Sequence, residues 1–408
     1  MQKEKTYRVF RLINRFNLGG PTFNVTYLSK FLSPEYETML AGGVKDESEA
    51  SSEHIPLEYG IKPLIIKNMK RSINPANDIF AYNNIRKIIS EFKPHIVHTH
   101  ASKAGFLGRM AAVSCKVPII VHTFHGHVFH SYFDNIQTTV YKNIERYLAS
   151  KSAALIALSE KQKMELTEIH KIAPAEKFHI IPLGFDLERF WTNTEEKRRI
   201  FRNRHGLDNN TVAVGIMGRL VPIKNHALFL DAFKNAKERT ENPVKAFIIG
   251  DGELKETLVN QCIKSGLSYS TIEKPNPNAS VIFTSWITDT DTALAGLDII
   301  ALSSLNEGTP VSLIEAQAAG KPVISTLAGG IENVVIPNET ALLSPVNDIA
   351  LFSENLYKLL NSSELRNNLS KKGKEFVSKN FSYVTLADNV GSLYKKLLQD
   401  KGLWKIEN

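Results

Sequence analysis

Short apolar runs alternate with helix-forming segments along nearly the whole chain, and this alternation restricts the fold more than any other feature. Parallel strands need long crossover connections, usually helices, so the alternation predicts parallel sheets built from βαβ units. In the first half the predicted strands are 7–13, 36–40, 96–100, 118–122, 154–158 and 178–182. In the second half they are 211–217, 245–249, 281–283, 298–302 and 322–325.

A chain of 408 residues is longer than a domain with a single hydrophobic core usually is, and its length fits two domains. We therefore predict an α/β fold with two Rossmann-like, doubly wound domains facing an interdomain cleft. The polar stretch 192–199 is predicted to link them, with domains over 1–190 and 191–384. Ligands of such sheets bind beyond the carboxyl ends of the strands, so functional residues are expected there.

Composition limits the cellular setting. The two cysteines, Cys115 and Cys262, have no CxxC spacing, which predicts a reducing compartment and no disulfide framework. No apolar run approaches the ~20 residues of a membrane helix, and the N-terminus shows no secretory signal. We expect a cytoplasmic protein.

The net charge of +8 is concentrated in the first half of the chain. Residues 1–200 contain 28 Lys and Arg against 20 Asp and Glu, and the remainder is balanced. A basic half is suited to an anionic substrate or an anionic membrane surface, although a merely solvated basic face would look the same. No nucleic-acid-binding motif accompanies the charge, so nucleic acid is not an expected partner.

Two carboxylates, Glu307 and Glu315, flank a Gly-Thr-Pro turn between a predicted strand and a helix that is expected to begin near Pro310. The N-terminus of a helix attracts phosphate, whereas carboxylates accept hydrogen bonds from hydroxyl groups. Phosphate held by backbone and hydroxyls held by carboxylates together predict a nucleotide-sugar ligand.

Two further loops could meet phosphate. Gly19 and Gly20 follow the first strand and precede a helix, although a purely structural turn explains them equally well. The spacing is not GxGxxG, which argues against a nicotinamide enzyme. Arg219 and Lys224 follow the first strand of the second half, where two cations could clamp a diphosphate.

Seven histidines lie between residues 95 and 130: His95, His98, His100, His122, His125, His127 and His130. Their spacing lacks a helical ligand pair and no carboxylate lies among them, so no metal is expected. His125 follows a strand at its carboxyl end and is predicted to reach the cleft, whereas His95, His122 and His130 fit structural roles. The aromatic stretch 128–133 fits membrane contact, acceptor binding or core packing.

In combination these motifs resemble the retaining glycosyltransferases of family 4, which have the GT-B fold. The resemblance runs nearly from end to end. It rests on Gly19-Gly20, the motifs 93–100, 124–126, 181–186, 218–225 and 249–253, and on the Glu-x7-Glu spacing of 307–315. In this fold the final helix, near 385–408, crosses back to the first domain.

The resemblance implies roles for individual residues. The implied donor-binding residues are Gly19, Gly20, Arg219, Lys224, Glu307, Gly308, Thr309, Pro310, Val311 and Glu315. Glu307 would contact hydroxyls of the donor sugar and Glu315 those of the ribose, while Arg219 and Lys224 would hold the diphosphate. The implied catalytic residues are His125, which would contact the transferred sugar, with Glu307, Lys224 and Arg219. The first domain would bind the acceptor.

The resemblance further implies same-side transfer of the sugar from a UDP-sugar to a glycan hydroxyl, with no cofactor and no metal. Asp289 and Asp291 match a DxD string but fit a helix cap better. Segment 102–105 resembles members that build bacterial surface polysaccharides on lipid-diphosphate-linked acceptors, at the inner face of the cytoplasmic membrane. The chain departs from the usual Asn-Gly-Val-Asp at Leu183. A nucleotide-sugar epimerase, a phosphorylase and a non-catalytic nucleotide-sugar-binding protein remain as alternatives.

Overall fold

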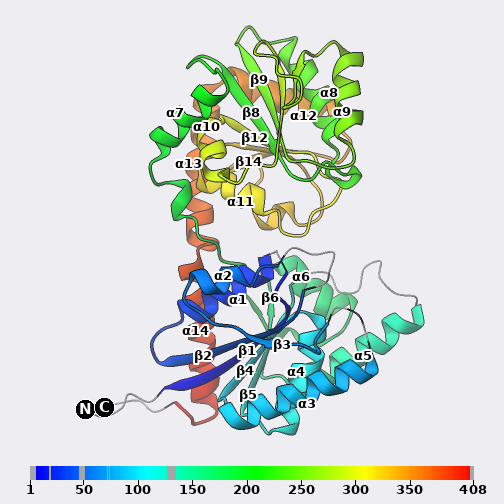
Figure 1. Ribbon diagram of the computed structural model, residues 1–408, viewed down its shortest axis with the longest axis vertical. Coiled ribbons are helices and arrows are strands. Elements are labelled where there is room, and N and C mark those ends of the chain that lie inside the picture. Colours follow the sequence, from blue (N-terminus) through cyan, green and yellow to red (C-terminus); the bar gives the residue numbers. More distant parts are fainter. Residues whose placement is uncertain are drawn as a thin grey trace. The chain divides into compact units, whose positions relative to one another are not determined.

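The computed structural model describes residues 6–17, 20–45, 51–70, 72, 74–125 and 135–404, with the side chains of 135–138 excepted. The chain forms two compact units (Figure 1). Unit 1 comprises Met1–Phe185 and Phe381–Asn408, and unit 2 comprises Asp186–Asn380. Each unit has its own parallel sheet and its own hydrophobic core.

The sheet of unit 1 has seven strands in the order β3-β2-β1-β4-β5-β6-β7, and every neighbouring pair is parallel. The strands are β1 (Tyr7–Arg15), β2 (Tyr36–Gly43), β3 (Leu64–Ile66), β4 (Ile96–His100), β5 (Ile119–Thr123), β6 (Ala154–Ala157) and β7 (Phe178–Ile180). The helices are α1 (Gly20–Lys30), α2 (His54–Glu58), α3 (Pro75–Phe92), α4 (Ser102–Ser114), α5 (Asn135–Lys151), α6 (Glu160–Met164) and α14 (Tyr383–Asp400).

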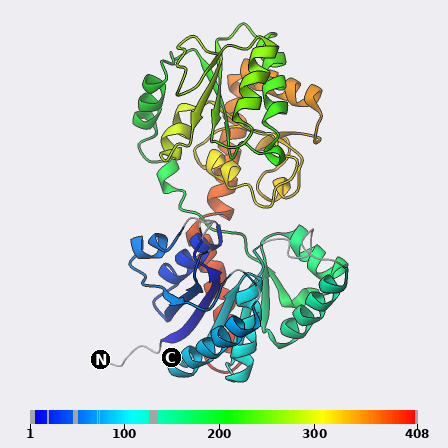
Figure 2. The same ribbon diagram turned by 45° about the vertical axis from the view of Figure 1, so that its right-hand side comes forward.

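The C-terminal helix α14 belongs to unit 1 and covers one face of its sheet together with α1 (Figure 2). Its apolar side buries Leu386, Val390 and Tyr394 against the strands. The backbone at Phe185 bonds to that at Phe381 and Tyr383, so the two places where the chain passes between units are joined. The opposite face of the sheet is covered by α3 and α4.

The sheet of unit 2 also has seven parallel strands, in the order β10-β11-β9-β8-β12-β13-β14. The strands are β8 (Val212–Met217), β9 (Val244–Ile249), β10 (Tyr269–Ser270), β11 (Val281–Ser285), β12 (Ile299–Leu302), β13 (Val323–Thr326) and β14 (Ala341–Ser344). The helices are α7 (Thr194–Arg204), α8 (His226–Lys237), α9 (Lys255–Ser265), α10 (Thr290–Gly296), α11 (Val311–Ala318), α12 (Ile349–Asn361) and α13 (Ser363–Asn380).

The predicted fold class, two doubly wound parallel sheets, is confirmed. All eleven predicted strands are present, one of them (96–100) with the predicted ends and the others with shifted ends, and β3, β10 and β14 were not predicted. These three strands have 3, 2 and 4 residues and all lie at the edges of their sheets. None of the described helices is both long enough and apolar enough to cross a bilayer.

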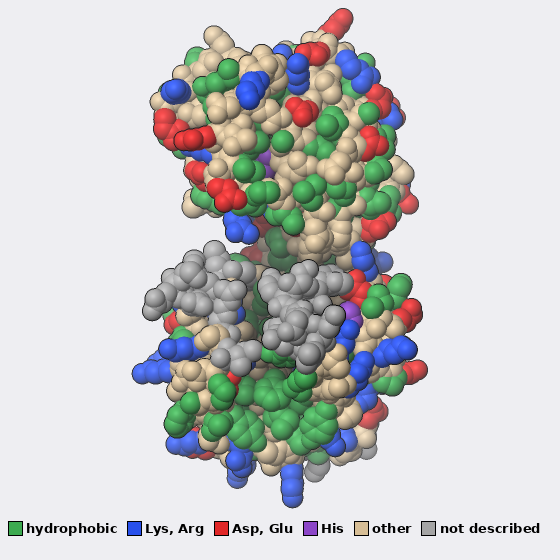
Figure 3. All heavy atoms as spheres, turned by 90° about the vertical axis from the view of Figure 1, so that its right-hand side faces the viewer, with side chains coloured by type: hydrophobic (Ala, Val, Ile, Leu, Met, Phe, Trp, Pro, Cys, Tyr) green, Lys and Arg blue, Asp and Glu red, His purple; other side chains and the backbone are tan. Residues whose placement is uncertain are grey.

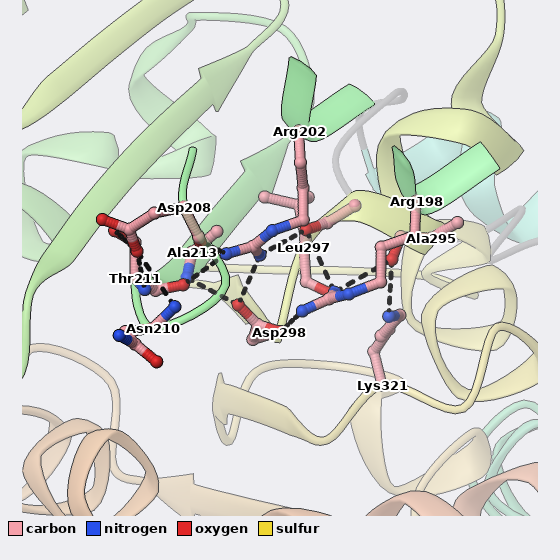
Figure 4. Close-up of polar contacts among 11 residues, drawn as sticks. Arg198, Arg202, Asp208, Asn210, Thr211, Ala213, Ala295, Leu297, Asp298 and Lys321 are labelled. Atoms are coloured by element: carbon pink, nitrogen blue, oxygen red, sulfur yellow. Dashed lines mark hydrogen bonds and ion pairs between the residues drawn. The ribbon is translucent and has the colours of Figure 1, made fainter. Parts of the chain in front are cut away.

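The prediction that 192–199 is a linker was wrong, because this stretch begins helix α7. Its charge indicated a solvated segment, but α7 buries Phe201 completely and pairs its cations with neighbouring groups. Arg198 and Arg202 both contact Asp298, which directly precedes β12, and donate to carbonyls at the C-terminal end of α10 (Figure 4). Cations at the C-terminus of a helix also interact favourably with the helix dipole, which stabilises the helix.

Candidate active site

Apart from His125, which follows β5, the described site residues lie on loops and helices near the place where the order of each sheet reverses. In unit 2 this switch point is between β8 and β12, and in unit 1 it is between β1 and β4. The loops leaving two such strands diverge to opposite faces of the sheet, which leaves a ligand-sized crevice at their carboxyl ends. Lys224 follows β8, and Glu307 follows β12.

Lys224 and Glu307 are in direct contact in unit 2. The Lys224 ammonium lies 2.5 Å from Glu307 Oε1, and Ser304 Oγ donates to the same oxygen at 2.6 Å. The two charged side chains are 25% and 11% exposed, so the pair is sheltered but accessible. Within the described residues no hydrogen bond to Glu307 Oε2 is found, which leaves this oxygen available to a ligand hydroxyl.

The loops that carry this pair are bonded to each other. Ser303 Oγ donates to the carbonyl oxygens of Lys224 at 3.1 Å and Asn225 at 2.8 Å, and Leu305 N donates to Ile223 O at 2.8 Å. Asn225 takes the left-handed conformation (φ 47°) that ends the turn before α8. The distance between Lys224 and Glu307 is therefore held by hydrogen bonds between the two loops and not only by their charges.

The turn Gly308–Val311 lies against a second glycine-containing loop. Gly330 N donates to Glu307 O at 2.8 Å, and a Cβ at Gly330 would lie 1.7 Å from Gly308 O. Gly329 has φ +61°, so both positions require glycine. Helix α11 begins at Val311, with Pro310 as N-cap, and its first N–H groups have no acceptor within the helix. This turn suits an anion.

Glu315 is paired with a residue that was not predicted. Arg189 donates to Glu315 Oε1 at 3.2 Å and to Thr290 Oγ1 at 3.4 Å. Burial raises the pKa of Glu315 above its ordinary value, and the Arg189 guanidinium opposes this shift. The pairing of Arg189 with Glu315, 126 positions further along the chain, left no signal in the sequence.

Arg219 is exposed at the end of β8. Its side chain forms no hydrogen bond or ion pair with any of the described residues, in contrast to that of Lys224, so its guanidinium is available to an anion. The structure therefore brings Lys224, Glu307 and the 308–311 turn together and leaves Arg219 free on the adjoining loop.

In unit 1, Gly20 is the first residue of α1, and Gly19 lies outside the described residues. His125 follows β5 at its carboxyl end, as predicted. Its Nε2 lies 2.9 Å from His100 Nδ1, and burial lowers the pKa of His125 to about 4. The imidazole is therefore neutral at physiological pH.

Among the other histidines, His95 accepts a hydrogen bond from Arg8 N at 3.0 Å, and His122 lies 2.8 Å from Thr99 Oγ1. Both contacts fit the structural role predicted for them. His127, His130 and the aromatic stretch 128–133 lie outside the described residues. The part of the chain that is described contains no cluster of three His, Cys, Asp or Glu side chains arranged to hold a metal ion.

The DxD carboxylates are ion-paired to α7: Asp289 with Arg204 at 3.2 Å and Asp291 with Lys197 at 2.8 Å. The predicted helix cap was wrong in detail, because Asp291, the expected cap, lies within the first turn of α10, and Asp289 occupies the N-cap position without a capping hydrogen bond. Lys103 of the 102–105 segment contacts Asp78 at 2.6 Å and Lys70 O at 2.9 Å, so it connects the start of α4 to the first turn of α3 and to the segment before α3.

Comparison with known proteins identifies the family. The family model described as "Glycosyl transferases group 1" matches residues 197–376, and the model described as "Glycosyltransferase Family 4" matches residues 25–189. Together they cover most of the chain.

Among curated proteins, the chain is 31% identical over 347 residues to the UDP-Gal:alpha-D-GlcNAc-diphosphoundecaprenol alpha-1,3-galactosyltransferase of Escherichia coli, covering 85% of this chain and 86% of that protein. It is 26% identical over 342 residues to the capsular polysaccharide biosynthesis glycosyltransferase CapM of Staphylococcus aureus, covering 81% of this chain and 84% of that protein.

Two solved structures share the fold. A glycosyltransferase from Rickettsia africae matches with a TM-score of 0.78 at 17% identity, over 97% of this chain and 99% of that one. Anabaena Alr3699/HepE in complex with UDP matches with a TM-score of 0.75 at 18% identity, over 95% and 100%. The chain therefore belongs to glycosyltransferase family 4 and is a hexosyltransferase-type glycosyltransferase with the GT-B fold.

Proposed function

We propose that this glycosyltransferase moves a hexose from a UDP-sugar to a hydroxyl of a lipid-diphosphate-linked glycan, with retention of anomeric configuration and without a metal. The observation that carries the proposal is the Lys224–Glu307 pair beside the N-terminus of α11. A diphosphate needs cations and free N–H groups, and a sugar needs a carboxylate acceptor. The loop cluster formed by residues 219–225 and 303–311 provides all three.

Departure of the nucleoside diphosphate builds negative charge on the leaving oxygen. We assign Lys224, the free guanidinium of Arg219 and the N–H groups of the 308–311 turn to its stabilisation, with Gly19 and Gly20 assisting. Fixed donors of this kind stabilise charge without reorganising during the reaction. Glu307 holds sugar hydroxyls through Oε2, Glu315 holds the ribose, and His125 donates to the transferred sugar.

The acceptor hydroxyl attacks on the face from which the phosphate leaves, and it passes its proton to the departing phosphate oxygen. The bond from the anomeric carbon to the acceptor oxygen forms as the bond to the phosphate oxygen breaks, so the configuration is kept. No protein carboxylate acts as nucleophile in this sequence. The two glutamates hold hydroxyls and do not form a hydrolytic acid–base pair.

A lipid-linked acceptor requires the enzyme to work at a membrane surface. The Escherichia coli relative is named for an acceptor on diphosphoundecaprenol. Unit 1 contains 28 Lys and Arg against 19 Asp and Glu, whereas unit 2 is nearly neutral. We propose that unit 1 contacts the anionic inner face of the cytoplasmic membrane.

One face of unit 1 carries the apolar groups that such contact needs. Figure 3 shows hydrophobic side chains gathered on it, bordered by Lys and Arg. The neighbouring helices α3 and α4 expose Ile79 and Phe80 at 60% each and Phe106 at 41%. Exposed lysines at 62, 67 and 70 flank β3, the element before α3. Apolar insertion and basic attraction act together at anionic bilayers.

Replacing Phe80 by Glu is expected to reduce binding to vesicles that contain anionic lipid at least tenfold, because the change removes an inserted ring and adds a repelled charge. Co-sedimentation with phosphatidylglycerol vesicles measures it. Ile263→Glu, at a residue of unit 2 that is 55% exposed, is the matched control and should bind as the wild type does. Equal binding of wild type and Phe80→Glu would remove this surface from the proposal.

Donor binding is tested by thermal shift with UDP-, GDP- and ADP-sugars. A ligand at one hundred times its Kd stabilises the folded state by about 2.7 kcal/mol, so UDP-sugars should raise the Tm by several degrees and the others should not. Adding a lipid-diphosphate-linked GlcNAc acceptor should then yield an α-linked product from an α-linked donor, in the presence of EDTA. A β-linked product would contradict retention, and epimerised UDP-sugar formed without acceptor would indicate an epimerase.

A further inference from the structure

A buried arginine lies among the histidines of unit 1. Arg11 of β1 is fully buried, and its NH1 lies 3.0 Å from His98 Nδ1, 3.5 Å from His100 Nε2 and 3.4 Å from the Tyr394 hydroxyl of α14. Its NH2 donates to Leu28 O of α1 at 3.4 Å. No role was predicted for Arg11.

The guanidinium determines which nitrogen of each ring carries a proton. Arginine only donates hydrogen bonds and stays charged in proteins, so the His100 Nε2 that faces it is an acceptor. Neutral His100 then carries its proton on Nδ1 and donates to His125 Nε2 at 2.9 Å. His125, neutral in its turn, carries its proton on Nδ1.

The neutral state of these rings follows from their surroundings. Burial lowers the pKa of His98 and His100 well below the ordinary value, and Arg11 lowers both further. The titratable and charged groups that affect the pKa of His100 are Arg11 from β1 and His98 from β4, together with His125 after β5 and His122 of β5, which lies on the other face of the sheet. Tyr394 of α14 bonds to His98 Nδ1 at 2.5 Å. No carboxylate is among these groups.

The chain of donors ends on an unsatisfied atom. His125 Nδ1 is buried and has no hydrogen-bond partner among the described residues. A buried donor without an acceptor is costly, so the arrangement is favoured where an acceptor completes it. An oxygen of a bound sugar is such an acceptor.

We propose that Arg11 and His100 are positioning residues of the transferase, which hold His125 in the Nδ1–H tautomer so that it donates to an oxygen of the transferred sugar. The inference rests on the proposed function for the identity of the acceptor. The series of hydrogen bonds from Arg11 through His100 to His125 lies entirely within unit 1 and does not depend on the proposed function. His98 and Tyr394 keep the guanidinium in place.

Kinetics of His100 variants test the role. His100→Leu should lower kcat/KM for the UDP-sugar 10- to 100-fold while leaving the Kd of UDP, which lacks the sugar, within a factor of two. His100→Asn, whose amide nitrogen can replace Nδ1 as donor, should recover most of the loss. In the double variant with His125→Ala, the His100→Leu change should have no further effect.

His122→Leu is the matched control, because His122 is an equally buried histidine that bonds to Thr99 on the opposite face of the sheet. Corrected for folded fraction, its kcat/KM should equal that of the wild type. Arg11→Met should move the acidic limb of the pH–rate profile to higher pH, since the guanidinium no longer depresses the pKa of His100. A purely structural role would lower activity equally at every pH.

Nitrogen-15 NMR of the ring nitrogens tests the tautomer without any activity. The His125 signals, assigned by their absence in His125→Ala, should show Nδ1–H in the wild type and a changed tautomer balance in His100→Leu. An Nε2–H tautomer in the wild type, or unchanged kcat/KM in His100→Leu, would overturn the inference. If the wild type transfers no sugar, the proposed function is wrong. The NMR result still decides whether His100 donates to His125 and holds it in the Nδ1–H tautomer.

Discussion

Replacing Lys224 by Met is expected to lower kcat/KM for sugar transfer about 100- to 1000-fold, the usual cost of removing one fixed donor from a site where charge develops. Lys224 is the only described cation in contact with Glu307, and the loops that hold it are bonded through Ser303 and Leu305. Methionine keeps most of the side-chain volume, so the loss should come from the ammonium and not from unfolding. Steady-state kinetics with a UDP-sugar and a lipid-linked acceptor measures it.

The control for this prediction is Lys234→Met on α8, whose ammonium makes only a long 3.8 Å contact with Glu238. It should transfer sugar at the wild-type rate. Glu307→Gln separates two functions of the pair. It removes the charge that fixes Lys224 but keeps an acceptor for a sugar hydroxyl, so the loss should be smaller than in Lys224→Met. Near-normal turnover of folded Lys224→Met would reject the assignment of this loop cluster as the donor site.

Much of the fold could be predicted because each strand is marked locally. An apolar run such as 299–302, followed by a glycine- or proline-containing turn and a helical pattern, identifies a βαβ unit without knowledge of its neighbours. The carboxyl ends of the strands are then known, so Lys224, Glu307 and His125 could be placed at the correct edge of a sheet. Their spacing in the sequence was sufficient for this step.

Contacts between distant segments could not be predicted in this way. Arg189 reaches Glu315 across 126 positions, and Arg11 reaches Tyr394 across 383. The identity of such partners depends on the order of strands in the sheet, which local patterns do not encode. The prediction for the charged stretch 192–199 failed for a related reason. Phe201, the apolar residue that α7 buries, lies beyond this stretch, and the carboxylates that pair with the cations of α7 lie far along the chain.

Replacing Asp298 by Asn is expected to destabilise the protein by about 3 kcal/mol, in the range measured when one partner of a sheltered charge pair is removed. Asp298 accepts from Arg198 at 2.8 Å, from Arg202 at 3.2 Å and from Ala213 N at 2.8 Å, and Lys321 lies in the same network (Figure 4). Without the carboxylate, three cations face one another. For a domain of this size the Tm should fall by about 6–12 °C by calorimetry.

Glu196→Gln is the matched control, since Glu196 pairs with Arg199 on the exposed side of the same helix and such pairs add little. Its Tm should stay close to that of the wild type, and an equal fall in both variants would mean that Asp298 has no special role.

The pH dependence tests the electrostatic cause. The pKa of Lys321 is lowered from 10.5 to about 8, mainly by burial; Arg198 and Arg202 contribute to the lowering, whereas Asp298 opposes it. Between these values the native state binds fewer protons than the unfolded chain, so stability rises with pH. Asp298→Asn lowers the Lys321 pKa again, and at pH 9 the lysine is neutral in the variant. The deficit measured by urea unfolding should therefore be smaller at pH 9 than at pH 7. A deficit independent of pH would assign the loss to the hydrogen bonds of Asp298 and not to its charge.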